Sequence, residues 1–431
     1  MKQSRISWPI LSAFTISFLY WIYRFTNSFS ADLIDYQALG RIIEHQGLIG
    51  YLITGPHREP IYPLICAWAM DIEKLSGIGF THIMAGFGIL MLMTTQVLTY
   101  IILKRLNIRP WICSLAILYW GISPAITNSA FNVLLFCEVA TYPFVLSVVI
   151  VGCQGWEAVD QDDKKKACIY GILSGSIFAV LTFIKAAFEC ICPAYFIFFL
   201  IAALLKKRIS FSLVCFLTAA GVLFYIPVIG YKCLNKFYNG NFVIADRGPV
   251  NLYGNVERRT GPLTPRKYLA DLASVGGVCG KYFKPQECSY WAYTESDRLG
   301  FQKSIELADQ HLPPQAVTDT LLRLSKQKAL NNLPQYFLLT LTEGLKMFFW
   351  EAPIPFFPLD FIAAIVTFLA FLYCGVYYKN TPNLIKHSLV IILFFVFFYS
   401  FFAILPRHIL PLVPLYLISI SYGFSKLLGK V

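Results

Sequence analysis

The stretch FECICPAYFIFFLIAALL, residues 188–205, holds one charged side chain, Glu189, in an otherwise apolar run. A helix needs about 20 such residues to cross the roughly 30 Å hydrocarbon core of a bilayer, so the stretch predicts a membrane span. The whole chain has the same character, since 57% of its residues are hydrophobic and 14% are charged, with a mean hydropathy of +0.60. Soluble domains carry about 25% charged residues. We therefore expect an all-α polytopic membrane protein.

Apolar runs of similar length recur along the chain, and together they predict ten transmembrane helices. We expect these at residues 8–26, 81–103, 109–126, 132–153, 167–184, 188–205, 210–230, 357–378, 387–405 and 409–425. The first run follows Lys2 and Arg5 without a small-residue cleavage site, which indicates an uncleaved anchor. The spans divide the chain into an N-terminal membrane module (1–230), a large outer region (231–356) and C-terminal spans (357–431).

Short loops rich in lysine and arginine mark the cytoplasmic side of a membrane. The segments expected there carry Lys2, Arg5, Lys104, Arg105, Arg109, Lys164, Lys165, Lys166, Lys206, Lys207, Arg208, Lys379, Lys386, Lys426 and Lys430. Both termini are then cytoplasmic, and residues 27–80 and 231–356 face outward. Much of the net charge of +12 thus orients the protein in its membrane, so we expect no nucleic-acid partner.

The outer region, residues 231–356, holds three of the 12 cysteines, whereas the others lie in or beside apolar runs. Two of the three, Cys279 and Cys288, could pair in an oxidising compartment, although spacing alone does not fix the connectivity. Residues 297–311 and 314–331 have helical periodicity. We therefore expect this outer region to be mostly helical.

The first outer loop gathers acidic, basic and aromatic residues at the membrane surface. It contains the stretches Asp32-Leu33-Ile34-Asp35-Tyr36 and Arg58-Glu59-Pro60-Ile61-Tyr62-Pro63. Apolar residues recur at helical spacing after Asp35, which predicts an amphipathic helix on the membrane: Tyr36, Leu39, Ile42 and Ile43. A second surface helix is expected at residues 61–75, because counting it as a span would reverse every later loop against the charge rule.

These motifs resemble the GT-C glycosyltransferases, particularly the branch that contains bacterial aminoarabinose transferase and the protein O-mannosyltransferases. That family has an acidic residue four positions before a tyrosine, as Asp32 and Tyr36 are here, and a second surface helix that opens on a Tyr-Pro motif. Further similar stretches follow in order: Leu134-Leu135-Phe136-Cys137-Glu138, Val250-Asn251-Leu252-Tyr253-Gly254-Asn255, Leu333-Pro334-Gln335-Tyr336-Phe337 and Arg407-His408-Ile409-Leu410-Pro411. Glu59 is a departure, because many relatives have proline there.

The resemblance implies a GT-C fold and transfer of a sugar from a polyprenyl-phosphate donor to a periplasmic glycan, lipid or protein, with inversion at the sugar. Such a transfer needs a general base for the acceptor hydroxyl and cations that stabilise the departing lipid phosphate. We expect Asp32 as the base, with Asp35 and Glu138 as supporting acids. The residues expected at the donor phosphate are Arg58, Lys185, Arg407 and His408. Those expected to bind the substrate are Tyr36, Glu59, Tyr62, Asn251, Tyr253 and Asn255. We assign no cofactor, and oxygen ligands from Asp32, Asp35 and Glu138 leave a divalent metal open.

Several of these residues also have a plain structural interpretation. Asp32 can cap a helix whose first turn holds Asp35. Lys185 and Glu189 can form a local ion pair, and Gly254-Asn255 can form a turn. A set of basic residues in the outer region is typical of a solvated face: Arg247, Arg258, Arg259, Arg266 and Lys267.

Other classes of protein share this architecture. An O-antigen polymerase or ligase also has many spans and a large outer loop, but it uses a lipid diphosphate-linked glycan. A transporter or flippase would carry ionisable residues or broken helices near mid-membrane, whereas the charges here lie at the ends of spans. A non-catalytic membrane scaffold is a further alternative. We expect a bacterial inner membrane with a periplasmic site, and the residues fit an endoplasmic reticulum location as well.

Overall fold

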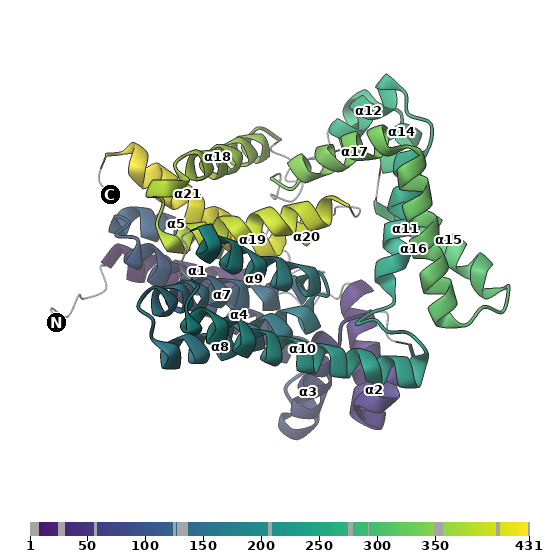
Figure 1. Cartoon of the computed structure of the whole chain (residues 1–431), viewed down its shortest axis with the longest axis horizontal. Coiled ribbons are helices and arrows are strands. Elements are labelled where there is room, and N and C mark those ends of the chain that lie inside the picture. The colour runs from purple at the N-terminus through teal and green to yellow at the C-terminus, as the bar shows by residue number, and fades with distance from the viewer. Residues whose placement is uncertain are drawn as a thin grey trace.

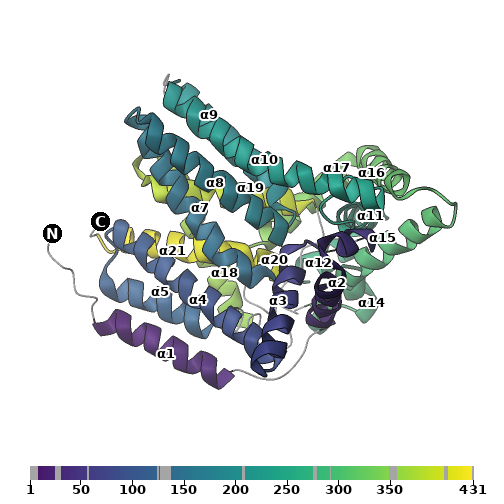
Figure 2. The ribbon, with the colours of Figure 1, turned by 90° about the horizontal axis from the view of Figure 1, so that it is seen from below.

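The computed structural model describes residues 8–24, 31–55, 58–123, 126, 137–205, 209–274, 279–291, 293–348, 357–401 and 406–429, and of residues 24, 31, 32, 293, 357–361, 406 and 407 it describes the backbone alone. The described chain is helical, without a strand (Figures 1 and 2). A bundle of apolar helices forms its main body: α1 (Trp8–Arg24), α4 (Phe80–Arg105), α5 (Pro110–Ile122), α7 (Cys137–Asp160), α8 (Lys164–Ile184), α9 (Phe188–Leu205), α10 (Phe211–Asn239), α18 (Phe357–Val376), α19 (Asn383–Ser400) and α21 (Val413–Leu427). The protein is an all-α polytopic membrane protein, as the sequence predicted.

Seven segments of this bundle are long and apolar enough to cross a membrane. They are α4, α7, α8, α9, α10, α19 and the stretch Leu410–Leu427, which includes α21. The three other expected spans correspond to shorter apolar helices among the described residues, in α1, α5 and α18. Each expected span therefore falls on an apolar helix, and the total of ten crossings stays a prediction.

Small residues let α8 and α10 cross with their backbones in close contact. A Cβ atom on Gly171 would lie 2.4 Å from the carbonyl oxygen of Phe216, and one on Gly175 would lie 2.2 Å from that of Ala220. Membrane helices commonly use small residues four positions apart for such crossings. This contact fixes the end of α8, and with it the short connection to α9, against α10.

A buried polar pair holds α19 in the bundle. The hydroxyl of Tyr195 on α9 lies 2.9 Å from Nδ1 of His387 on α19, and both side chains are buried. A buried polar group costs free energy unless it is hydrogen-bonded, so this pair favours one rotation of α19 about its axis. That rotation sets the direction of Tyr399, near the end of the helix.

The helices between α10 and α18 form a cap at one end of the bundle, opposite the end where α1 begins and α21 ends (Figures 1 and 2). They are α11 (Arg247–Thr260), α12 (Pro265–Leu272), α13 (Cys279–Tyr282), α14 (Pro285–Trp291), α15 (Tyr293–Ala308), α16 (Pro314–Asn331) and α17 (Leu333–Lys346). The helices expected at 297–311 and 314–331 are thus confirmed as α15 and α16. Cys279 and Cys288 form a disulfide, and Cys233 is a free, exposed thiol.

The cap is fastened to the end of α19 by two side chains of α11. Arg259 Nη1 donates to the carbonyl of Ser400 over 2.6 Å, and Asn255 Nδ2 donates to the carbonyl of Phe401 over 2.7 Å. The last carbonyls of a helix lack partners within it, and the negative end of the helix dipole attracts a cation. We call Asn255 and Arg259 the latch. The expectation of a solvated face is wrong for Arg258 and Arg259, which are 2% and 0% exposed.

A buried network of charges supports the latch. Arg258 lies 3.8 Å from Glu343, and Lys346 binds both Glu343 (3.2 Å) and Asp271. Desolvation raises the pKa of Asp271, and the Lys346 ammonium opposes this shift. Desolvation likewise lowers the pKa of Arg259, against the attraction of Glu343. Buried charges are tolerated when they are paired and hydrogen-bonded, so the network makes α11 depend on α12 and α17.

The two surface helices expected in the first outer loop are α2 (Ala31–Ile53, bent at Gly47) and α3 (Ile61–Ser76). They pack closely, since a Cβ atom on Gly40 of α2 would lie 2.9 Å from the Cβ of Cys66 on α3. The apolar face of α2 is buried in the protein, and Tyr36 on this face is 3% exposed. The amphipathic pattern therefore reflects packing on α3 and its neighbours.

Replacing Arg259 with methionine should loosen the cap. The variant keeps roughly the length of the side chain but removes its charge and its donors. The Ser400 carbonyl then loses a hydrogen-bond donor, and Glu343 loses a nearby cation. We expect a loss of roughly 3 kcal/mol, seen as a lower midpoint when the protein in detergent is unfolded by heat and followed by tryptophan fluorescence.

Arg266→Met is the matched control for this substitution. Arg266 forms an exposed ion pair with Glu287 at 2.6 Å, and exposed pairs contribute little to stability, so its midpoint should stay at the wild-type value. An Arg259→Met protein as stable as the control would show that the latch does not hold the cap.

Candidate functional site

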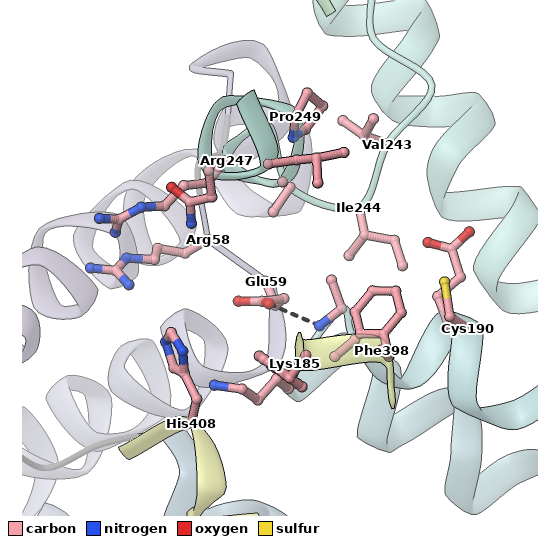
Figure 3. A pocket seen from close by; sticks show the side chains of 18 of the residues that line it. Arg58, Glu59, Lys185, Cys190, Val243, Ile244, Arg247, Pro249, Phe398 and His408 are labelled. Atoms are coloured by element: carbon pink, nitrogen blue, oxygen red, sulfur yellow. Dashed lines mark hydrogen bonds between the residues drawn. The ribbon is translucent and has the colours of Figure 1, made fainter. Parts of the chain in front are cut away.

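A cavity of about 520 Å³ lies where the bundle, the cap and the first outer loop meet (Figure 3). It is lined by residues from α2, the α2–α3 connection, α7, the α8–α9 connection, the start of α9, α10, the α10–α11 connection, the start of α11, α16, the end of α19 and α20 (Pro406–Ile409). Seven of the residues expected from the sequence line this cavity: Tyr36, Arg58, Glu59, Glu138, Lys185, Asn251 and His408. The structure thus brings together side chains that are far apart in the chain.

A buried ion pair forms the floor of the cavity. Glu138 is the second residue of α7 and Lys185 directly follows α8, so both lie at helix ends on the same side of the bundle. Lys185 Nζ lies 2.5 Å from Glu138 Oε1, with the two side chains 10% and 4% exposed. Desolvation opposes the charge of Lys185, but the attraction of Glu138 outweighs it and raises the lysine pKa, so Lys185 stays an ammonium.

The local ion pair that the sequence allowed between Lys185 and Glu189 is not the one that forms. Glu189, in the first turn of α9, instead accepts from Lys232 of α10 over 2.7 Å. The continuation of α10 to Asn239, beyond the expected end of its span, brings Lys232 to the cavity wall. Packing between α9 and α10 therefore decides the partner.

The first outer loop supplies a second cation. Arg58 Nε donates to Asp35 Oδ2 over 2.8 Å, and the guanidinium carbon lies 5.1 Å from the centre of the Tyr36 ring. Tyr51 donates its hydroxyl to the main-chain carbonyl of Arg58 over 2.5 Å. Asp35 thus orients Arg58, and its role as a supporting acid stays a prediction.

Tyr36 faces the cavity as a neutral phenol. Its hydroxyl donates to Cys137 Sγ over 3.2 Å, and its ring meets that of Tyr62 edge-on, with the centres 4.7 Å apart. Burial raises the pKa of Tyr36, and charges nearby, including Glu59, add to this shift. The tyrosine therefore offers a hydrogen-bonding group that does not ionise at ordinary pH.

Glu59 sits between the first outer loop and the α8–α9 connection. Its Oε1 accepts the main-chain N–H of Ala186 over 2.8 Å, the bond drawn as a dashed line in Figure 3. Glu59 lies just before Pro60, the N-cap of α3, so its backbone is fixed by the start of that helix. The bond ties the first outer loop to the residue that follows Lys185.

The C-terminal part of the chain adds two aromatic rings. His408, on α20, lies 5.5 Å from Tyr399 at the end of α19, measured between ring centres. Lys185 Nζ is 6.0 Å from the centre of the Tyr399 ring. Tyr399 thus stands beside both His408 and Lys185, and no motif in the sequence identified it, because an aromatic residue at the end of an apolar span is common.

Arg247 completes the wall on the cap side. Its Nη2 lies 2.6 Å from Asp297 Oδ2, and its guanidinium carbon lies 5.8 Å from the centre of the Phe301 ring. The sequence placed Arg247 on a solvated face, but its side chain is about one-fifth exposed and lines the cavity. A run of basic residues does not reveal which member a helix turns inward.

Three residues expected to bind substrate lie away from the cavity. Tyr62 is 2% exposed behind Tyr36, and Tyr253 is 6% exposed in the core of the cap. Asn255 donates to the Phe401 carbonyl and accepts from Arg258, so its amide serves the latch. The turn expected at Gly254-Asn255 is wrong, because both residues are inside α11.

The structure fixes the backbone positions of two more expected residues, whose side chains lie outside the described part. Asp32 is in the first turn of α2, one helical turn before Tyr36. Arg407 is in α20, next to His408. Asp32 therefore lies one turn before a residue that lines the cavity, and Arg407 lies directly before one.

The two carboxylates expected as supporting acids are each paired with a cation of the protein. Asp35 binds Arg58 and Glu138 binds Lys185. Within the described residues, no group of three or more His, Cys, Asp or Glu side chains is arranged to hold a metal ion. Most described charges of the cavity belong to ion pairs, including the Lys185 ammonium, which is paired with Glu138. Glu59 has a main-chain N–H as its described partner instead. Such a site can bind a phosphate through its cations and hydroxyl groups through its oxygens.

Comparison with known proteins gives a distant similarity. No protein-family profile and no curated protein matches this sequence. Among solved structures, the chain is similar to the archaeal oligosaccharyltransferase AglB from Archaeoglobus fulgidus, in complex with an inhibitory peptide and a dolichol-phosphate, with a TM-score of 0.48 and 10% sequence identity. The similarity covers 97% of this chain and 50% of that one, so this chain spans about half the length of AglB. At this level the similarity does not assign the chain to a family.

Proposed function

We propose that this protein is an integral membrane glycosyltransferase that takes a sugar from a polyprenyl-phosphate donor and transfers it to an acceptor at the outer face of the membrane. The cavity is the observation that supports this most. Lys185, Arg58 and His408 line it at the level where apolar helices end, and so does Tyr36, one turn after Asp32. A lipid chain beside the bundle would carry its phosphate to this level.

The donor phosphate is proposed to bind Lys185. An ammonium has three N–H groups, and among the described contacts Lys185 gives one of them to Glu138. The other two are available to phosphate oxygens. Arg58 and His408 line the same cavity, and Arg407, next to His408, is a further candidate from the sequence. Charge-assisted bonds of this kind are about twice as strong as neutral ones.

The proposed reaction is a direct displacement at the anomeric carbon. The acceptor hydroxyl gives its proton to Asp32 as its oxygen forms a bond to that carbon. The bond from the anomeric carbon to the phosphate oxygen breaks, and its electron pair leaves with the lipid phosphate. The cations stabilise the charge that develops on this leaving group. Attack opposite to the leaving group inverts the configuration at the sugar.

The distribution of charged residues supports an outward-facing cavity. Lysine and arginine concentrate in the loops at the bundle end away from the cap, including Lys104, Arg105 and Lys164 to Lys166. Such loops remain on the cytoplasmic side, which would place the cap in the periplasm of a bacterial cell. The acceptor would then be a periplasmic glycan, lipid or protein.

Asp32→Asn should abolish transfer without abolishing donor binding. The amide keeps the shape of the carboxylate but takes up no proton, so we expect a loss of roughly 10²- to 10⁴-fold in rate. Purified protein in lipid would be given a panel of radiolabelled polyprenyl-phosphate sugars, with a membrane extract as acceptor, and incorporation of label would be measured.

The control is Asp309→Asn, which changes an exposed carboxylate of the cap and should leave transfer unchanged. Full activity of Asp32→Asn would remove Asp32 from the reaction. Failure of the wild type to use any monophosphate donor, together with transfer from a diphosphate-linked glycan, would favour the polymerase or ligase alternative.

Lys185→Met should weaken binding of polyprenyl phosphate at least about tenfold, because a charge-assisted bond to phosphate is lost. The single variant also leaves Glu138 buried without its cation, so the double variant Lys185→Met/Glu138→Gln separates binding from stability. Binding of the lipid to protein in nanodiscs measures the effect. Lys303→Met, in an exposed pair with Glu306, is the control. Wild-type affinity in the double variant would exclude Lys185 as a phosphate ligand.

A further inference from the structure

Glu59 differs from every other charged residue of the cavity wall in the partners that it has. The cations that line the cavity each have a carboxylate partner: Arg58 has Asp35, Lys185 has Glu138, Lys232 has Glu189 and Arg247 has Asp297. Glu59 also lines the cavity, and within the described residues it forms no ion pair. The described site therefore carries one carboxylate more than its cations balance.

A hydrogen bond from the protein fixes the position of Glu59, but no described cation of the protein pairs with its charge. One oxygen accepts the Ala186 N–H over 2.8 Å, which holds the carboxylate in place. Figure 3 shows the group near the middle of the view, in the cavity that Lys185 and His408 also line. An ionised carboxylate has two oxygens and accepts about four hydrogen bonds but donates none. A ligand that fills the cavity should therefore present hydrogen-bond donors to Glu59.

Glu59 is also tied to two of the proposed phosphate ligands, Arg58 and Lys185. It follows Arg58 directly in the chain, and the N–H that it accepts belongs to the residue after Lys185. A phosphate held between these cations would place the sugar that it carries in the same cavity as Glu59. The hydroxyl groups of this sugar are donors of the kind that the carboxylate needs.

We propose that Glu59 binds hydroxyl groups of the transferred sugar and excludes sugars that carry an acidic group, so that the donor bears a neutral or amino sugar. This inference rests on the proposed function. A second carboxylate, such as that of a uronic acid, would lie a few ångströms from Glu59. The cations on either side of Glu59, Arg58 and Lys185, already have carboxylate partners and are proposed to bind the phosphate as well. Coulomb repulsion at this separation, between the limits for water and for a protein surface, corresponds to a preference of about tenfold to a few hundredfold.

Glu59→Gln tests this assignment with little change in shape. The glutamine oxygen can still accept the Ala186 N–H, while its NH₂ group adds donors and the negative charge is lost. Three probes would be compared by competition binding to the full chain in nanodiscs: polyprenyl phosphate alone, a polyprenyl-phosphate hexose and a polyprenyl-phosphate hexuronate. The wild type should prefer the hexose to the hexuronate by at least about tenfold. In Glu59→Gln this preference should fall to about threefold or less.

Two further measurements keep the result specific. Glu59→Asp retains the charge and should retain most of the preference. Polyprenyl phosphate alone should bind Glu59→Asp about as well as the wild type and Glu59→Gln at least as well, because removing a negative charge does not weaken binding of an anion. Equal binding of hexose and hexuronate by the wild type, or an unchanged preference in Glu59→Gln, would overturn the inference and leave the proposed function standing. Failure of all three probes to bind the wild type would instead overturn the proposed function, and this inference with it.

Discussion

A lysine buried at the end of an apolar helix requires a carboxylate beside it, and this requirement organises the cavity. Lys185 meets Glu138 at 2.5 Å, so the end of α8 must lie against the start of α7. The next N–H along the chain, that of Ala186, donates a hydrogen bond to Glu59 of the first outer loop. The ion pair and the adjoining hydrogen bond thus together connect the membrane helices to the first outer loop. If either partner were lost, the other would remain as an uncompensated buried charge.

The end of α19 serves the cavity and the cap at once. Tyr399 stands beside Lys185 and His408, and the adjoining carbonyls of Ser400 and Phe401 are the acceptors for the latch. A cap that shifted would therefore move a residue of the cavity wall by way of two hydrogen bonds. This arrangement gives the outer region a direct mechanical connection to the proposed donor site, in addition to the wall that Arg247 provides.

Hydrophobic length and periodicity predicted most of the fold, because the apolar runs, the two surface helices and α15 and α16 are properties of contiguous sequence. Residues of the candidate site were predicted from the sequence, but the contacts between them were not. Lys185 was expected from its place at the outer end of a span, and Glu59 from its place in the first outer loop. Their partners were not predicted, since Glu138 is 47 positions from Lys185 and helix packing decides which ends meet. Arg259 was expected in solvent because spacing does not separate a solvated face from a buried one. The apolar residues around it in α11, such as Val256, were the available signal.

The latch also sets an order of events during synthesis. Arg259 and the Ser400 carbonyl that it binds are separated by 141 residues. At ribosomal rates of about 5 to 20 residues per second, about 7 to 28 seconds pass between the synthesis of the two. During this interval α11 is already synthesised, but the carbonyl at the end of α19 that Arg259 binds in the folded protein does not yet exist. The cap must therefore wait, partly assembled, until α19 enters the membrane, and the cavity cannot close its wall at Tyr399 before that moment.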